Sequence, residues 1–168
     1  MATKFNWGVN KSLLQTPEIK DRLEALTQII FIPKGITEKM AYTCAKLIIG
    51  RKYCIVKTKS LVWLEMHLND VLKSYNMNGV ADMYLPIVKH VHDTGYYEIK
   101  VDIVCQDENP YNVIKAEFLA LKEHVGNTLC INKENKPYMP KYNSKTKMYG
   151  WLTINQFLNF GKLVKAHT

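Results

Sequence analysis

The sequence predicts an α+β fold with the element order β-α-β-β-α-β, the split βαβ arrangement of ferredoxin-like sheets, preceded by two helices and followed by one. Three observations lead to this prediction. Short runs rich in Tyr, Val and Ile alternate with amphipathic stretches that begin at helix-capping residues. A glycine turn at 93–95 separates two alternating segments. The 168 residues fit one domain and suffice to bury a core of their own.

Composition divides this single domain into four parts. Residues 1–50 are predicted to be a helical N-terminal part, and residues 51–133 the α/β sheet core. Residues 134–150 are a basic loop rich in Lys and Tyr, and residues 151–168 a C-terminal helix.

Two helices are expected before the sheet. Thr16-Pro17-Glu18 combines an N-cap, a proline at the first helical position and an acid in the first turn, and apolar residues follow at helical spacing as far as Ile30. Thr37 is the expected cap of a second helix that ends at Gly50. The segment Lys52 to Thr58 then has the composition of a strand.

A third helix is expected to begin at the cap residue Ser60 and to end at Asn78-Gly79. Its apolar stripe consists of Leu61, Leu64, Leu68, Leu72 and Tyr75.

A β-hairpin is predicted from strands at 83–92 and 96–105. The odd positions of both segments are mainly apolar, so both strands must turn their odd positions to one core. A three-residue loop, Asp93-Thr94-Gly95, keeps odd opposite odd and places glycine where a left-handed residue is needed. The opposite, open face then carries Tyr96 and Lys100.

Three elements complete the chain. Asn109 and Pro110 predict the start of a helix that ends at Gly126. Residues Thr128 to Lys133 are expected to form a strand. Thr153-Ile154-Asn155-Gln156 matches the capping box that opens a terminal helix.

The composition is that of an ordinary globular protein with a net charge of +8. Such a charge favours an anionic partner, and the 21 Lys against two Arg favour diffuse electrostatic contact over base-specific reading. An AT-rich coding genome would produce the same Lys-rich bias.

The four cysteines lack metal-ligand spacing and are expected to be reduced. Neither a signal peptide nor a transmembrane segment is recognisable, so a cytoplasmic or nuclear location is expected, within the host cell if the protein is viral.

The basic loop is the strongest candidate for binding. Its lysines would contact phosphates and its tyrosines would stack on bases. The predicted nucleic-acid-binding residues are Lys133, Lys136, Tyr138, Lys141, Tyr142, Lys145, Lys147 and Tyr149, with Tyr96 and Lys100 from the open sheet face. A solvated connection whose charge keeps the protein soluble is the alternative for the loop. The open face is similar in position to the RNA-binding face of the RNA-recognition fold, although the aromatic consensus of that family is absent.

His90-Val91-His92 suggests a different chemistry. On a strand, both histidines would point the same way, and the pair resembles the His-hydrophobic-His motif of rolling-circle initiator nucleases. That resemblance implies Tyr111 as nucleophile with Lys115 nearby. A structural pair of histidines is the competing interpretation, and neither a catalytic residue, a metal nor a cofactor is assigned.

The sequence thus predicts a small accessory protein, viral or from a phage, that binds single-stranded nucleic acid or RNA with low sequence specificity. One alternative is a non-catalytic viral structural, matrix-type or host-factor-binding protein, which would self-associate or bind another protein. Rhabdovirus matrix proteins are similar in being small and basic with mixed α/β order. The metal-dependent endonuclease is the second alternative.

Overall fold

The structure, a computed structural model, describes residues 30–33, 35, 39–74, 83–95, 98–124, 126–132 and 139–167. Several predicted features lie outside these residues: the helix start at Thr16, the cap Thr37, the helix end at Asn78-Gly79, and Tyr96. Ile30, the last apolar position of the first predicted helix, lies in a strand.

The described residues form an α+β fold. Its elements are β1 (Ile30–Phe31), β2 (Tyr42–Ile49), β3 (Lys52–Thr58), α3 (Leu61–Ser74), α4 (Leu85–Thr94), β4 (Ile99–Asp107), α5 (Pro110–His124), β5 (Tyr142–Asn143), β6 (Met148–Tyr149) and α6 (Ile154–Ala166). Four strands make a mixed sheet in the order β1-β4-β2-β3, and β5 pairs with β6. β1 is parallel to β4, and the other pairs are antiparallel.

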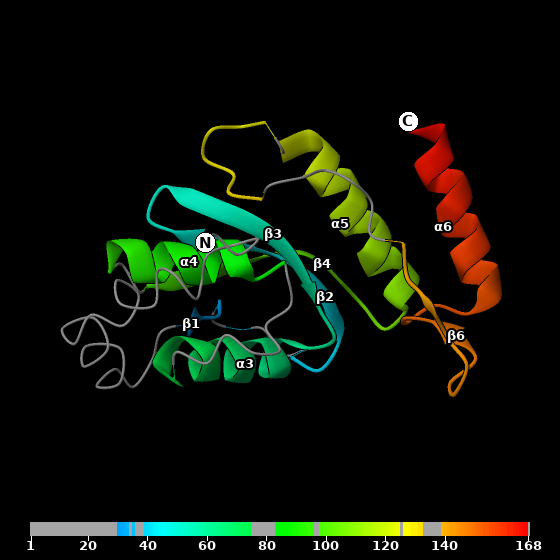
Figure 1. Cartoon of the computed structure of the whole chain (residues 1–168), viewed down its shortest axis with the longest axis horizontal. Helices are drawn as coiled ribbons and strands as arrows, with labels where there is room; N and C mark the ends of the chain where they lie inside the picture. Colours follow the sequence, from blue (N-terminus) through cyan, green and yellow to red (C-terminus); the bar gives the residue numbers. More distant parts are fainter. Residues whose placement is uncertain are drawn as a thin grey trace, which may run out of the picture.

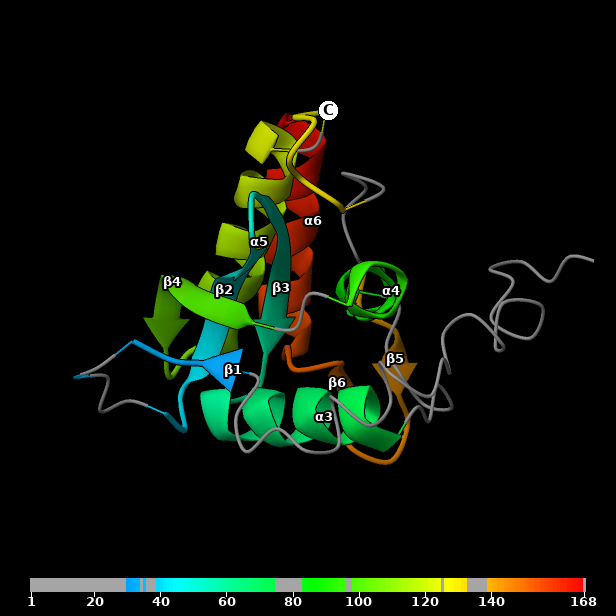
Figure 2. The ribbon, with the colours of Figure 1, turned by 90° about the vertical axis from the view of Figure 1, so that its left-hand side faces the viewer.

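Helices cover both faces of the sheet (Figures 1 and 2). α3 and α4 bury the main core against one face, where Leu47, Val56 and Val101 are almost fully buried. α5 packs against the opposite face over Cys44 and Ile55. α6 lies alongside α5 and contacts it through Phe118 and Phe160, so it forms an outer layer (Figure 1).

The second predicted helix is wrong, because its C-terminal half is the central strand β2. This strand is covered on both faces, so Thr43, Cys44, Ala45 and Leu47 are all buried and no alternation marks it as a strand. Gly50 has a φ of +62° as expected, but it turns a two-residue hairpin between β2 and β3.

The hairpin predicted at 83–105 is also wrong, because its first strand is the helix α4. Tyr84, Ile87, Val88 and Val91 are buried at helical spacing, and exposed Lys89 is the position that broke the strand alternation. Gly95 is left-handed, with a φ of +73°, but as a helix C-cap whose N–H donates to the Val91 carbonyl.

The loss of that strand changes the predicted order β-α-β-β-α-β. The described elements instead run β-β-β-α-α-β-α before the small β5–β6 pair and α6. The second half of the predicted hairpin is confirmed as β4, with Ile99 and Val101 buried in the core and Lys100 and Asp102 exposed.

Four sequence signals are confirmed. Lys52–Thr58 is a strand, and the Ser60 hydroxyl caps α3 by accepting from Trp63 N–H at 3.0 Å. Asn109 caps α5 by accepting from Tyr111 N–H, and the capping box of Thr153 and Gln156 opens α6.

Two predictions near the C-terminus need correction. The expected strand at 128–133 is reduced to a single parallel bridge between Cys130 and Tyr53. The predicted loop at 134–150 contains a short hairpin, β5–β6, between Tyr142 and Tyr149.

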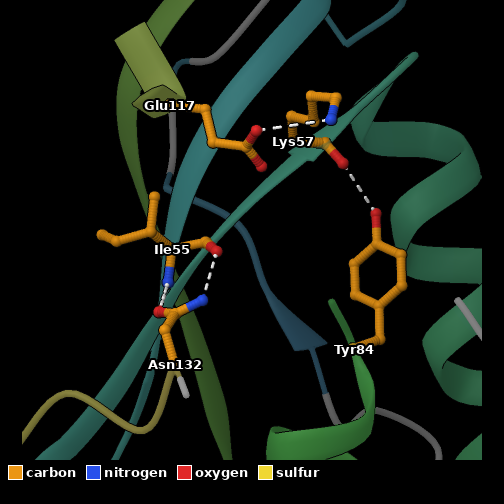
Figure 3. A network of polar contacts seen from close by, with 5 residues as sticks. All are labelled: Ile55, Lys57, Tyr84, Glu117 and Asn132. Atoms are coloured by element: carbon orange, nitrogen blue, oxygen red, sulfur yellow. Dashed lines mark hydrogen bonds and ion pairs between the residues drawn. The ribbon is translucent and has the colours of Figure 1, made fainter. Parts of the chain in front are cut away.

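β3 is an edge strand of the sheet formed by the described residues, and its outer edge is satisfied by residues 129–132 and by Tyr84. Tyr53 bonds to the backbone at Leu129 and Ile131. The Asn132 amide accepts from the Ile55 N–H at 2.7 Å and donates to the Ile55 carbonyl at 3.0 Å (Figure 3). The Tyr84 hydroxyl donates to the Lys57 carbonyl at 2.9 Å. No exposed ladder is left at these positions for another chain to extend.

No helix within the described ranges has both the length and the apolarity needed to cross a bilayer.

Replacing Asn132 with Ala tests whether its side chain stands in for a missing strand. The change leaves both polar groups of Ile55 without the amide, and we expect a loss of about 1–3 kcal/mol in the free energy of unfolding. Urea denaturation followed by circular dichroism measures this loss. Asn159→Ala on the exposed side of α6 is the matched control and should cost nothing. Equal stabilities of the two variants would contradict this role.

Candidate nucleic-acid interface

The hairpin β5–β6 presents lysines on a tightly fixed turn. The Asn143 side chain accepts from the backbone N–H groups of Lys145 and Thr146, and the Lys147 N–H donates to the Asn143 carbonyl at 2.7 Å. Lys147 has a φ of +58°, a left-handed conformation in which glycine or asparagine is more favourable. A lysine therefore occupies a position where its backbone is strained.

Stacked aromatic rings anchor this hairpin to α6. The Tyr149 ring stacks on Phe157 with the centroids 4.1 Å apart, and Tyr142 packs against Tyr149 at 5.1 Å. At the base, the Gly150 N–H donates to the Lys141 carbonyl. Tyr142 is the outermost ring, 54% exposed, whereas Tyr149 is half-buried and acts as its support.

The charge of this region is entirely of one sign. No Asp or Glu follows Glu134 in the sequence. The described residues 139–167 contain five lysines, all exposed: Lys141, Lys145, Lys147, Lys162 and Lys165. The hairpin and α6 therefore form one positively charged unit, which we call the basic unit (residues 139–167).

The structure brings together half of the predicted binding residues. Lys141, Tyr142, Lys145, Lys147 and Tyr149 all lie on the β5–β6 hairpin or at its base. Lys133, Lys136, Tyr138 and Tyr96 lie outside the described residues.

Lys100 belongs to a different surface. It pairs with Ile48 near one end of β2, whereas the basic unit reaches β2 at the other end, where Trp151 packs on Tyr42 at 5.0 Å. Six residues of strand, roughly 20 Å, separate these ends. Lys100 therefore lies apart from the hairpin.

A small cavity of about 170 Å³ lies where the basic unit meets the body of the fold. Its walls come from the end of β3, the first turn of α3, the start of α4 and the residue after Gly150. The lining residues are Lys57, Thr58, Lys59, Trp63, Met83, Tyr84 and Trp151. The lining is almost wholly apolar, with lysines from the end of β3 at its margin.

One residue of the cavity lining, Lys57, belongs to a buried ion pair. The Lys57 Nζ lies 3.3 Å from the Glu117 carboxylate on α5, and both side chains are more than 90% buried (Figure 3). Lys57 also lies 5.8 Å from the centre of the Trp151 ring, so the ammonium contacts both α5 and the basic unit. Burial raises the pKa of Glu117, and the Lys57 ammonium opposes that rise.

These cavity residues were missing from the sequence-based site. Lys57 interrupts the apolar run of β3, and Glu117 lies between the apolar positions Ile114 and Phe118 of α5. A charge within an apolar face is the signal that indicates a buried partner. The absence of acids after Glu134 is a second signal, because it shows that the basic region continues beyond the predicted loop and includes α6.

The histidine pair does not converge on the chemistry of a nuclease. His90 and His92 lie on α4, where residues two apart point in roughly opposite directions, and His92 is buried. Tyr111 lies on α5, across the sheet, and packs between α5 and α6. Within the described part of the chain, no three His, Cys, Asp or Glu residues are grouped as metal ligands would be.

Comparison with protein-family models, curated proteins and solved structures yields no match for this chain.

A double-mutant cycle tests the ion pair that joins β3 to α5. Glu117→Leu removes the carboxylate beside the buried Lys57 ammonium, and we expect it to cost about 3–5 kcal/mol of unfolding free energy. Lys57→Met/Glu117→Leu should regain at least half of that loss, because both charges are then absent. Urea denaturation of the wild type, Glu117→Leu, Lys57→Met and the double variant gives the four free energies of the cycle.

The exposed ion pair between Lys89 and Asp93 on α4 supplies the control. Asp93→Asn should cost less than about 1 kcal/mol, because water already screens that pair. A Glu117→Leu variant as stable as Asp93→Asn would contradict the importance of the buried pair.

Proposed function

We propose that this protein binds single-stranded nucleic acid through its basic unit, without catalysis. The observation that carries the proposal is the set of five exposed lysines without a single acid in residues 139–167. Lysines at such a surface neutralise phosphates and release counterions, which is the main source of affinity for nucleic acid.

The exposed ring of Tyr142 supports a single-stranded ligand over a duplex. Unpaired bases can stack on an aromatic ring, whereas bases within a duplex already stack on each other. The Tyr149 and Phe157 rings behind it hold Tyr142 in one orientation. A ligand therefore meets a prearranged platform between lysines.

Low sequence specificity follows from the residue types of the basic unit. It contains no arginine, the side chain that best reads guanine edges. Lysine contributes a point charge and tyrosine a stacking surface that accepts any base.

Salt dependence tests the proposal. Five lysine–phosphate contacts on a single strand predict a slope of about −3.5 in log K against log salt, or roughly a hundredfold loss of affinity between about 50 and 200 mM. Lys145→Gln/Lys147→Asn should flatten the slope to about −2. Asparagine suits the left-handed position of Lys147, so this variant keeps the turn. Fluorescence anisotropy with a labelled oligonucleotide measures both slopes.

Lys100→Gln/Lys115→Gln is the matched control, since it removes the same charge from two exposed lysines outside the basic unit. It should retain most of the wild-type affinity. Equal losses of affinity in the two double variants would show that diffuse attraction, and not a site on the hairpin, accounts for binding. An affinity independent of salt would contradict the proposal.

Self-assembly is the second candidate function, and one observation favours it. Ile154 and Leu158 are 53% and 54% exposed one turn apart on the outer side of α6. If this pair joins two copies, light scattering without nucleic acid will report a mass above 19.5 kDa that Ile154→Ser/Leu158→Ser returns to the monomer. A monomeric wild-type protein would exclude this function.

A further inference from the structure

We infer that the cavity between Trp63 and Trp151 is a binding pocket for one nucleobase of the strand held by the basic unit. This inference rests on the proposed function, and it names which part of the ligand enters the fold. Its volume of about 170 Å³ is below the ~300–1,000 Å³ of sites for drug-sized molecules, so it fits a single planar ring system.

Two tryptophans give the pocket walls suited to a flat ring. Trp63 is 40% exposed, and His67 stacks on it with the centroids 4.4 Å apart, which holds the indole in one orientation. Burial lowers the pKa of His67, which favours the neutral imidazole in this stack. The Tyr84 hydroxyl donates a hydrogen bond to the Lys57 carbonyl, and this bond fixes the Tyr84 ring as well. The walls are thus arranged before any ligand binds.

The charges around the pocket favour a nucleotide over the other guests of aromatic sites. A methylated ammonium group also binds between aromatic rings, but the exposed lysine in the lining, Lys59, would repel it, whereas the charge of Lys57 is compensated by Glu117. A nucleobase is uncharged, and the phosphate on the sugar that bears it would lie near exposed Lys59. Aromatic walls with lysine at the margin therefore match a base linked to a phosphate.

The position of the pocket is continuous with the basic unit. Trp151 follows Gly150, whose N–H is bonded to the Lys141 carbonyl at the base of the hairpin. Lys141 directly precedes β5, whose first residue is Tyr142. A strand that leaves the pocket thus meets lysine and tyrosine side chains immediately. The apolar lining offers few groups that could distinguish one base from another, in agreement with low sequence specificity.

The test compares two oligomers of about ten units, within the range of single-stranded sites, on the full chain. One carries only abasic sugar-phosphate units, and the other carries one central thymine among them. Both have the same charge, so they bind equally to the lysines. We expect the single base to tighten binding to the wild-type protein by roughly tenfold, and Trp63→Ala to abolish this gain.

Three further variants assign the gain to the pocket. Met83→Trp fills the cavity and should abolish the gain even if Trp63→Ala proves unstable. Met66→Ala, exposed on the same helix but not part of the lining, should keep it. Tyr142→Ala removes the stacking ring of the hairpin, so it should weaken the binding of an intact thymine strand; the gain from the single base should persist, because that base occupies the pocket.

The outcomes separate the two proposals. The pocket inference is contradicted if the base adds no affinity, or if Tyr142→Ala removes the gain while Trp63→Ala and Met83→Trp keep it. In either case the proposed binding by the basic unit is unaffected. If neither oligomer nor an intact thymine strand binds at low salt, the proposed function fails and the pocket inference fails with it.

Discussion

The outer edge of β3 is the constraint on which the rest of this fold depends. An edge strand must satisfy its outward N–H and C=O groups, and among the described residues no fifth strand of the sheet does so. A backbone bridge at 129–131, the Asn132 amide and the Tyr84 hydroxyl each take one stretch of that edge. The connection after α5 and the start of α4 are thereby held against the same strand (Figure 3).

Lys57 extends this arrangement to the C-terminal part of the chain. Its carbonyl is bonded to Tyr84 on one side of the strand, and its ammonium reaches Glu117 on α5 and the Trp151 ring on the other. Burying two charges is costly, and the pair is stable only because each side chain has the other within 3.3 Å. The cavity lies at this end of β3, where Lys57 contacts Tyr84, Glu117 and Trp151.

The candidate site was predictable in composition but not in extent. The basic loop, with Lys141, Tyr142, Lys145, Lys147 and Tyr149, was visible as a cluster in the sequence, because its residues are close along the chain. Tyr84 and Trp151 could not be associated with it, because only the packing of α4 and the hairpin against β3 brings them together. The separation of Lys100 also depends on packing, since it follows from the position of β4 in the sheet.

By itself, the sequence determined the local features whose physics involves neighbouring residues only. Ser60, Asn109 and Thr153 cap helices as their side chains dictate, and Gly50 and Gly95 are left-handed as expected. Tertiary structure decided which role each glycine has. Gly50 was expected to end a helix but turns a hairpin, whereas Gly95 was expected to turn a hairpin but ends a helix. Periodicity could not choose, because β2 is buried on both faces and α4 has apolar residues that also fit an alternating strand. The choice between helix and strand depended on which other elements cover each segment, and no local sequence pattern contains that information.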